Sequence, residues 1–317
     1  YRVRPLKRGD QTFGKTELLM TSPLQFFRQR RYVGEEEIVK VYPNFAELTK
    51  FAILATDNQV SQMGIRKRQR RGEGMEFHQL REYRQGDSLR QLDWKATSRC
   101  KKLISREYQD ERDQQILFLV DCGQRMRSKD GNMSHFDYAL DAMLLLSYVA
   151  LKQGDAVGFF AFGGEDRWQS PRKGTTAVNA LLNSVYDLQP TTKAADFTQA
   201  AMGLLGRQRK RSLVVLLTNV GGEELGDLLP ALKLLKRQHL VLVANLREKA
   251  LDENLTRKVS TFDEAISYSA THLYLDNRQK RFKQIQQQGV LMIDVNPEDL
   301  PVSVVNRYLD IKRSGRL

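Results

Sequence analysis

We predict an α/β fold, built as a doubly wound and mostly parallel sheet, from two observations. A continuous apolar run, Ile116 to Val120, ends at an acid, Asp121, and such runs are typical of strands that are covered on both faces. Similar runs then alternate with amphipathic helical patterns to the end of the chain, as in repeated βα units. Ligand sites of open α/β sheets lie at the carboxyl ends of the strands. The sequence therefore places any site near Asp121.

The remaining elements of this domain, residues 116–317, follow in regular order. Strands are expected at 156–162, 213–219, 240–245 and 290–295, with a short strand near Trp168. Helices are expected at 136–153, 176–186, 197–207, 225–237, 262–288 and 301–313. Because the helices alternate with the strands in repeated βα units, both faces of the sheet should be covered.

Residues 1–50 predict a small β-rich domain, part of a β-sandwich, that is truncated here. Short extended runs at Arg2–Leu6, Lys15–Met20 and Glu37–Tyr42 alternate with turn residues. Because the chain begins at Tyr1 inside such a pattern, we expect it to be part of a longer protein.

Residues 51–115 are expected to form a linker and an arm. A helix is expected over 45–60, and a basic run, Arg66–Arg71, is closed by glycines. In the arm that follows, Gly74–Arg112, arginines alternate with acids and aromatic residues, which predicts ion pairs and stacked rings that fix a segment with little apolar surface.

The composition is that of a globular protein with an excess of basic residues. Lysine and arginine number 51 against 38 acids, a formal charge of +13, and they occur throughout the chain. Such a charge suits an acidic partner, anionic lipid headgroups or nucleic acid. The two cysteines, Cys100 and Cys122, form neither a disulfide framework nor a metal-ligand pattern. We expect a reducing compartment and a buried, inert Cys122.

Part of the arm resembles a known signature. The matching residues are Gly74, Phe77, His78, Arg81, Tyr83, Gly86, Asp87, Arg90, Asp93, Trp94, Lys95 and Arg99. This segment resembles domain-of-unknown-function family 58, in which it precedes a von Willebrand factor type A-like domain. The resemblance implies a bacterial protein on the cytoplasmic side of the inner membrane, anchored by transmembrane helices outside this chain. It also implies an adaptor role beside a MoxR-type AAA+ ATPase.

Type A domains hold a divalent cation above the sheet, and the resemblance allows their ligand positions to be compared. Asp121 keeps the first acid, but Gly123 and Arg125 replace two serines, and Asn219 stands at the later acid position. Alanines in Lys193–Phe197 stand where a threonine is needed. Mg²⁺ requires several oxygen ligands, so we expect a degenerate site without a cofactor, in which the charge of Arg125 replaces the metal.

The sequence thus favours a non-enzymatic protein interaction module. The expected partner surface comprises Asp121, Gly123, Arg125, Asp196, Asn219 and Gly221. For Asp121, a cap of the following loop is an equal alternative to partner binding. Other functions remain open: nucleic-acid binding through the basic run and the arm, an Mg²⁺-dependent adhesion-type module and, last, a metal-dependent hydrolase.

Overall fold

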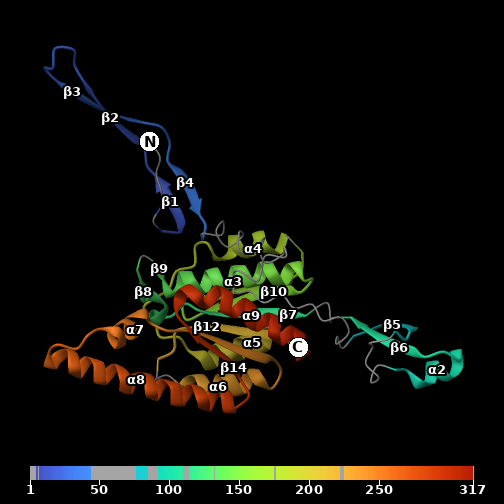
Figure 1. The fold of residues 1–317 in the computed structure, drawn as a ribbon. Coiled ribbons are helices and arrows are strands. Elements are labelled where there is room, and N and C mark those ends of the chain that lie inside the picture. The colour runs from blue at the N-terminus through green and yellow to red at the C-terminus, as the bar shows by residue number, and fades with distance from the viewer. Residues whose placement is uncertain are drawn as a thin grey trace.

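The centre of the protein is a six-stranded sheet (Figure 1). The computed structural model describes residue 5 and residues 7–43, 76–84, 92–109, 114–131, 133–174, 176–221 and 225–316. The strands, in spatial order, are β11 (Arg167–Arg172), β10 (Ala156–Phe162), β7 (Gln115–Asp121), β12 (Leu213–Thr218), β13 (Leu240–Leu246) and β14 (Leu291–Val295). All neighbours are parallel except β11, which pairs antiparallel with β10. Counted from β7 this is the doubly wound order 3-2-1-4-5-6, which confirms the predicted fold class.

Helices cover both faces of this sheet (Figure 1). One layer comprises α3 (His135–Lys152), α4 (Thr176–Val185) and α9 (Leu300–Arg313), and the other comprises α5 (Phe197–Arg207), α6 (Leu225–Lys236) and α8 (Phe262–Gln287). Successive residues of β7 face opposite layers, so Phe118 joins the core beneath α3 while Leu117 joins the core beneath α5. Among the described residues, no helix combines the length and apolar character needed to cross a bilayer.

Shorter elements lie between the strands and the helices that follow them. They are η3 (Gln124–Arg127), β8 (Lys129–Asp130), β9 (Met133–Ser134), α7 (Lys249–Thr256) and η4 (Pro297–Asp299). A capping box of Ser134 and Asp137 starts α3 directly after β9. The loop from Asp121 to α3 is therefore fixed where α3 begins.

The first described segment is a two-stranded ribbon. β1 (Gly9–Phe13) pairs with β4 (Glu37–Val41), and β2 (Thr16–Thr21) pairs with β3 (Arg28–Val33), all antiparallel. The strands expected at 15–20 and 37–42 are present, whereas the one expected at 2–6 falls almost wholly outside the described residues. Most side chains of the ribbon are exposed. Within residues 7–43 no second sheet packs on it, so this part has the form of a ribbon and not of a sandwich.

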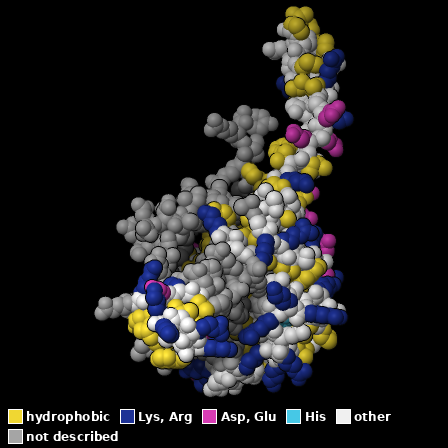
Figure 2. Space-filling view, turned by 90° about the vertical axis from the view of Figure 1, so that its right-hand side faces the viewer, with side chains coloured by type: hydrophobic (Ala, Val, Ile, Leu, Met, Phe, Trp, Pro, Cys, Tyr) yellow, Lys and Arg dark blue, Asp and Glu magenta, His cyan; other side chains and the backbone are white. Residues whose placement is uncertain are grey.

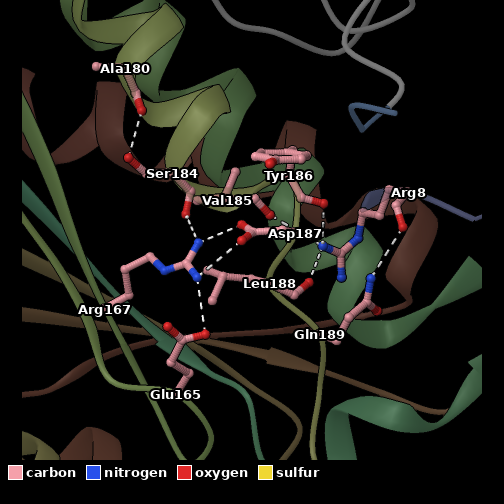
Figure 3. Close-up of polar contacts among 10 residues, drawn as sticks. All are labelled: Arg8, Glu165, Arg167, Ala180, Ser184, Val185, Tyr186, Asp187, Leu188 and Gln189. Atoms are coloured by element: carbon pink, nitrogen blue, oxygen red, sulfur yellow. Dashed lines mark hydrogen bonds and ion pairs between the residues drawn. The ribbon is translucent and has the colours of Figure 1, made fainter. Parts of the chain in front are cut away.

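Arg8 joins the base of the ribbon to the main domain. Its Nε donates to Asp137 Oδ1 at 2.6 Å, and Nη1 donates to the carbonyls of Val185, Tyr186 and Leu188. Figure 3 shows the guanidinium of Arg8 directed at this carbonyl-lined turn, beside a second cluster in which Arg167 donates to Asp187. One arginine, whose side chain is 8% exposed, thus links the ribbon to the start of α3 and the end of α4.

The arm forms a unit of β5 (Glu76–Glu82), α2 (Trp94–Cys100) and β6 (Ile104–Gln109). Asp93 caps α2 by accepting from Ala96 N at 3.0 Å, and its second oxygen accepts from Arg106 Nε at 2.9 Å. The hydrogen bond from Ala96, followed by that from Arg106, lowers the pKa of Asp93. The ion pairs expected in the arm are therefore present at this position. The expected helix over 45–60 and the basic run 66–71 lie outside the described residues.

Candidate functional site

Asp121 ends β7 at the carboxyl edge of the sheet, and it is buried. Its side chain is held from two sides: Oδ1 accepts from Gly123 N at 2.7 Å, and Oδ2 accepts from the Thr218 hydroxyl at 2.7 Å. Burial raises the pKa of Asp121, while these two hydrogen bonds and the positive charge of Arg125 act in the opposite direction. Only 1 % of the surface of Asp121 is exposed, and its carboxylate stabilises the loop that begins at Gly123 from inside the protein. This is the loop-cap alternative, and direct contact with a partner is not compatible with this burial.

Gly123 is required by the close approach of a second loop. A Cβ at this position would lie 2.9 Å from Asp121 Oδ1 and 3.0 Å from Ala195 Cβ. A serine, which type A domains place here, would clash with both groups. Ala195 lies against Gly123, so the alanine expected in place of a ligating threonine faces the same point as Asp121.

The residues around Asp121 do not suit the divalent cation of type A domains. Both carboxylate oxygens accept hydrogen bonds inside the protein, Gly123 and Ala195 offer no side-chain oxygen, and Thr218 supplies a single hydroxyl. Mg²⁺ requires near-octahedral coordination by oxygen. Across the described ranges, no group of three or more His, Cys, Asp and Glu side chains is placed to hold a metal.

Asn219 takes a different role from the one predicted. The residue that reaches Asp121 is Thr218, whereas Asn219 Nδ2 donates to His135 Nδ1 at 2.9 Å. The other ring nitrogen, Nε2, lies 2.8 Å from Asp130 Oδ2. Because an amide nitrogen can only donate, Nδ1 accepts and Nε2 carries the proton. Hydrogen bonds from Asp130 through His135 to Asn219 thus connect β8 and α3 to the end of β12.

The ends of β12, β13 and β14 are joined by a second polar chain. Asn245 Oδ1 accepts from Val220 N at 2.7 Å, and its amide donates to Asp294 Oδ1 at 3.0 Å. Arg278 of α8 donates to the same Asp294 oxygen at 2.8 Å and to Leu246 O at 3.0 Å. Burial acts to lower the pKa of Arg278, but the hydrogen bond and charge of Asp294 outweigh it and raise that pKa. This series of hydrogen bonds fixes α8 against the carboxyl edge of the sheet.

A polar cavity of about 340 Å³ lies between the loops after β7, β12 and β13 and helix α8. We name it the Arg125 cavity, and its lining residues are Arg125, Ser128, Asn219, Gly221, Glu248, Tyr274, Asn277 and Arg281. A Cβ added to Gly221 would lie 3.3 Å from Tyr274 Oη and 3.8 Å from Arg125 Nη1. Glycine at 221 therefore leaves room for the guanidinium and the phenol to approach each other.

The six residues predicted for partner binding thus do not all lie at one site. Arg125, Asn219 and Gly221 line the Arg125 cavity, and Asp121 with Gly123 lies beneath it. Asp196 caps α5 by accepting from Gln199 N at 2.9 Å and lines a separate cavity of about 460 Å³. The structure does not bring Asp196 into the Arg125 cavity.

Sequence reasoning missed the contribution of α8. Tyr274, Asn277 and Arg281 recur at i, i+3 and i+7, so they share one helix face, and all three line the Arg125 cavity. That spacing was visible in the sequence, but nothing local showed that this face meets the carboxyl edge of the sheet.

Cys122 follows Asp121 and is buried, as predicted. Burial, followed by the negative charge of Asp121, raises the pKa of its thiol to about 12. At neutral pH the thiol is therefore protonated and a poor nucleophile.

Comparisons with solved structures gave matches with low TM-scores. The conserved hypothetical protein BatB from Bacteroides thetaiotaomicron is 13% identical, with 63% of this chain and 99% of that chain covered and a TM-score of 0.38. A von Willebrand factor type A structure from Catenulispora acidiphila is 11% identical, covering 67% and 44%, with a TM-score of 0.40. An aerotolerance-related membrane protein from Bacteroides fragilis NCTC 9343 is 15% identical, covering 62% and 98%, with a TM-score of 0.35. These scores are low, so the fold assignment rests on the strand order. The comparison with curated proteins found no match.

The family comparison is decisive, because one family model matches residues 79–271, more than half of the chain. The matched range begins inside the arm at β5 and ends in α8, so it includes the Asp93 cap and most of the Arg125 cavity. The chain belongs to the family described as protein of unknown function DUF58.

Proposed function

We propose that the chain is a non-enzymatic interaction module that binds an acidic side chain of a partner protein in the Arg125 cavity. The observation that carries this proposal is the placement of two guanidinium groups, Arg125 and Arg281, at the carboxyl edge of the sheet. Ligand sites of open α/β sheets lie at this edge. The cavity is accessible, since Tyr274 on its wall is 37% exposed.

The lining of the cavity suits a carboxylate. Arginine binds carboxylates through two parallel hydrogen bonds, and the Tyr274 hydroxyl and the Asn277 amide add neutral donors. Among the described residues that line the cavity, Glu248 is the single acid. A type A domain would use its bound cation for this contact, and here a fixed guanidinium takes that role.

The partner that the family resemblance suggests is a MoxR-type AAA+ ATPase, with this chain as its adaptor on the cytoplasmic side of the bacterial inner membrane. An adaptor needs a specific surface and no reacting groups, which agrees with a buried Asp121 and a protonated Cys122.

Charge reversal at Arg125 is expected to weaken binding of a MoxR-type ATPase by about thirtyfold or more, the effect of losing a central charged contact. Native mass spectrometry and a pull-down with purified ATPase would measure it for Arg125→Glu. The matched control is Arg257→Glu, which changes the same charge at an exposed position after α7 and outside the cavity. This control should bind within about twofold of the parent chain, because an exposed charge contributes little.

Two results would contradict the proposal. One is unchanged binding of Arg125→Glu, which would remove the cavity from the contact. The other is equal loss in both variants, which would reflect net charge and not a defined site.

A further inference from the structure

The opposite edge of the sheet has a distinct character. Parallel strands begin at one common edge, and the helices that precede them end there. Six of the described segments meet at this amino-terminal edge, beside the start of β7: 152–156, 172–174, 207–213, 233–240, 287–291 and 310–316. Their exposed cations are Lys152, Arg172, Lys173, Arg207, Arg209, Lys210, Arg211, Lys233, Lys236, Arg237, Arg313 and Arg316. Figure 2 looks onto this side of the molecule, with the arm nearest the viewer, and shows lysine and arginine side chains of both parts over the lower half.

Acids do not balance these cations. The six segments contain two acids, Asp155 and Asp310. Asp155 is buried and bound to Lys312, and Asp310 pairs with Arg313 at 3.6 Å. These six segments together are therefore strongly positive, and the mutual repulsion of their cations is unfavourable for the fold.

Helix stability explains only part of this charge. Cations in the last turn of a helix interact favourably with its dipole, and Lys152, Arg207 and Lys236 are such residues. Arg209, Lys210 and Arg211 lie beyond the end of α5, in the loop before β12, where this benefit has ended. An edge that keeps additional cations in its loops is suited to a polyanionic surface.

The edge also contains an apolar hollow of about 670 Å³ between the end of α6 and the turn before β14. Leu232 and Val290 form its floor, and Lys233, Lys236 and Arg237 line it with positive charge. Lys236 is fixed there because its Nζ donates to the carbonyl of Gln288. An apolar hollow with a cationic rim matches an anionic amphiphile, which carries both a headgroup and a hydrocarbon part.

We propose that the amino-terminal edge of the sheet docks on an anionic phospholipid surface. Nucleic acid suits the edge less well, because single strands bind to aromatic side chains in a positive groove, and the six segments contain no Phe, Tyr or Trp. Docking here leaves the Arg125 cavity, at the other end of the strands, open to a protein partner. The inference is independent of the proposed function.

Vesicle co-sedimentation of the whole chain tests this inference. We expect binding to vesicles of phosphatidylcholine and phosphatidylglycerol in equal parts, none to phosphatidylcholine alone, and a steep loss as KCl rises, because salt screens exposed charges. The double variant Arg209→Glu/Lys210→Glu should weaken binding at least about tenfold, since each basic residue near an anionic membrane contributes substantially.

The matched control is Arg257→Glu/Lys258→Glu, an exposed Arg-Lys pair between α7 and α8. It changes the net charge equally and should bind within about twofold of the parent chain. Both pairs lie in exposed loops, and circular dichroism checks that each variant folds. Equal binding to both kinds of vesicle, or equal loss in the two double variants, would overturn the inference. Binding of a labelled DNA duplex without binding of anionic vesicles would assign the edge to nucleic acid instead.

Discussion

Asp155→Ala is expected to lower the free energy of unfolding by about 3–5 kcal/mol, the typical loss when one member of a buried ion pair is removed. The Asp155 carboxylate is fully buried and accepts from Lys312 Nζ at 2.9 and 2.8 Å and from the Tyr308 hydroxyl. It joins the turn after α3 to α9. Without it, the Lys312 ammonium, whose side chain is 11% exposed, and the Tyr308 hydroxyl lose their partner.

Urea unfolding followed by circular dichroism would measure this loss. The matched control is Asp276→Ala, which breaks an exposed pair with Lys280 at 2.7 Å. This control should cost less than about 1 kcal/mol. Adding Lys312→Met to Asp155→Ala should restore part of the stability, because no unpaired charge then remains in the interior. Equal losses for Asp155→Ala and Asp276→Ala would show that the buried pair does not stabilise the fold.

Asp294→Ala is expected to cost about 3 kcal/mol, again because a buried charge loses its partner. Arg278 is 2% exposed, and its guanidinium donates to Asp294 at 2.8 Å. The same carboxylate oxygen accepts from Asn245, whose own oxygen holds the Val220 amide next to Gly221. The variant should therefore loosen the Arg125 cavity and also weaken partner binding.

Asp294→Asn separates the two contributions of this residue. The amide oxygen still accepts hydrogen bonds while the charge is removed, so we expect a smaller loss of about 1–2 kcal/mol. Chemical unfolding of both variants gives the two values. If the alanine variant were as stable as the parent chain, the polar chain from Arg278 to Val220 would not determine the position of α8.

The main domain could be predicted from the sequence because its signals are local. Apolar runs such as Ile116–Val120 are covered on both faces, and each occupies a strand of the sheet. The ribbon was harder to predict, since β3 reads Arg-Gln-Arg-Arg-Tyr-Val and is exposed throughout. A strand without a buried face shows no alternation of apolar and polar residues. The helix α7 was not expected either, because none of its residues is buried and it therefore has no apolar face that the sequence could reveal.

The site could be predicted only in part, because its geometry depends on which residues face each other across loops. The end of β12 illustrates this, since Thr218, its last residue, reaches Asp121, whereas Asn219, the next residue, reaches His135. The steric need for Gly123 depends on Ala195 from a distant loop. Neither contact has a signal in the sequence near Asp121.

We propose that fixed side chains replace a metal ion at the carboxyl edge of the sheet. Isothermal titration calorimetry of the chain with Mg²⁺ and with Mn²⁺ tests it most directly, with Asp121→Ala as the reference variant. We predict no saturable binding of either ion by either protein, because the oxygens of Asp121 are already engaged by Gly123 and Thr218. Micromolar binding that disappears in Asp121→Ala would show that this edge of the sheet still holds a cation.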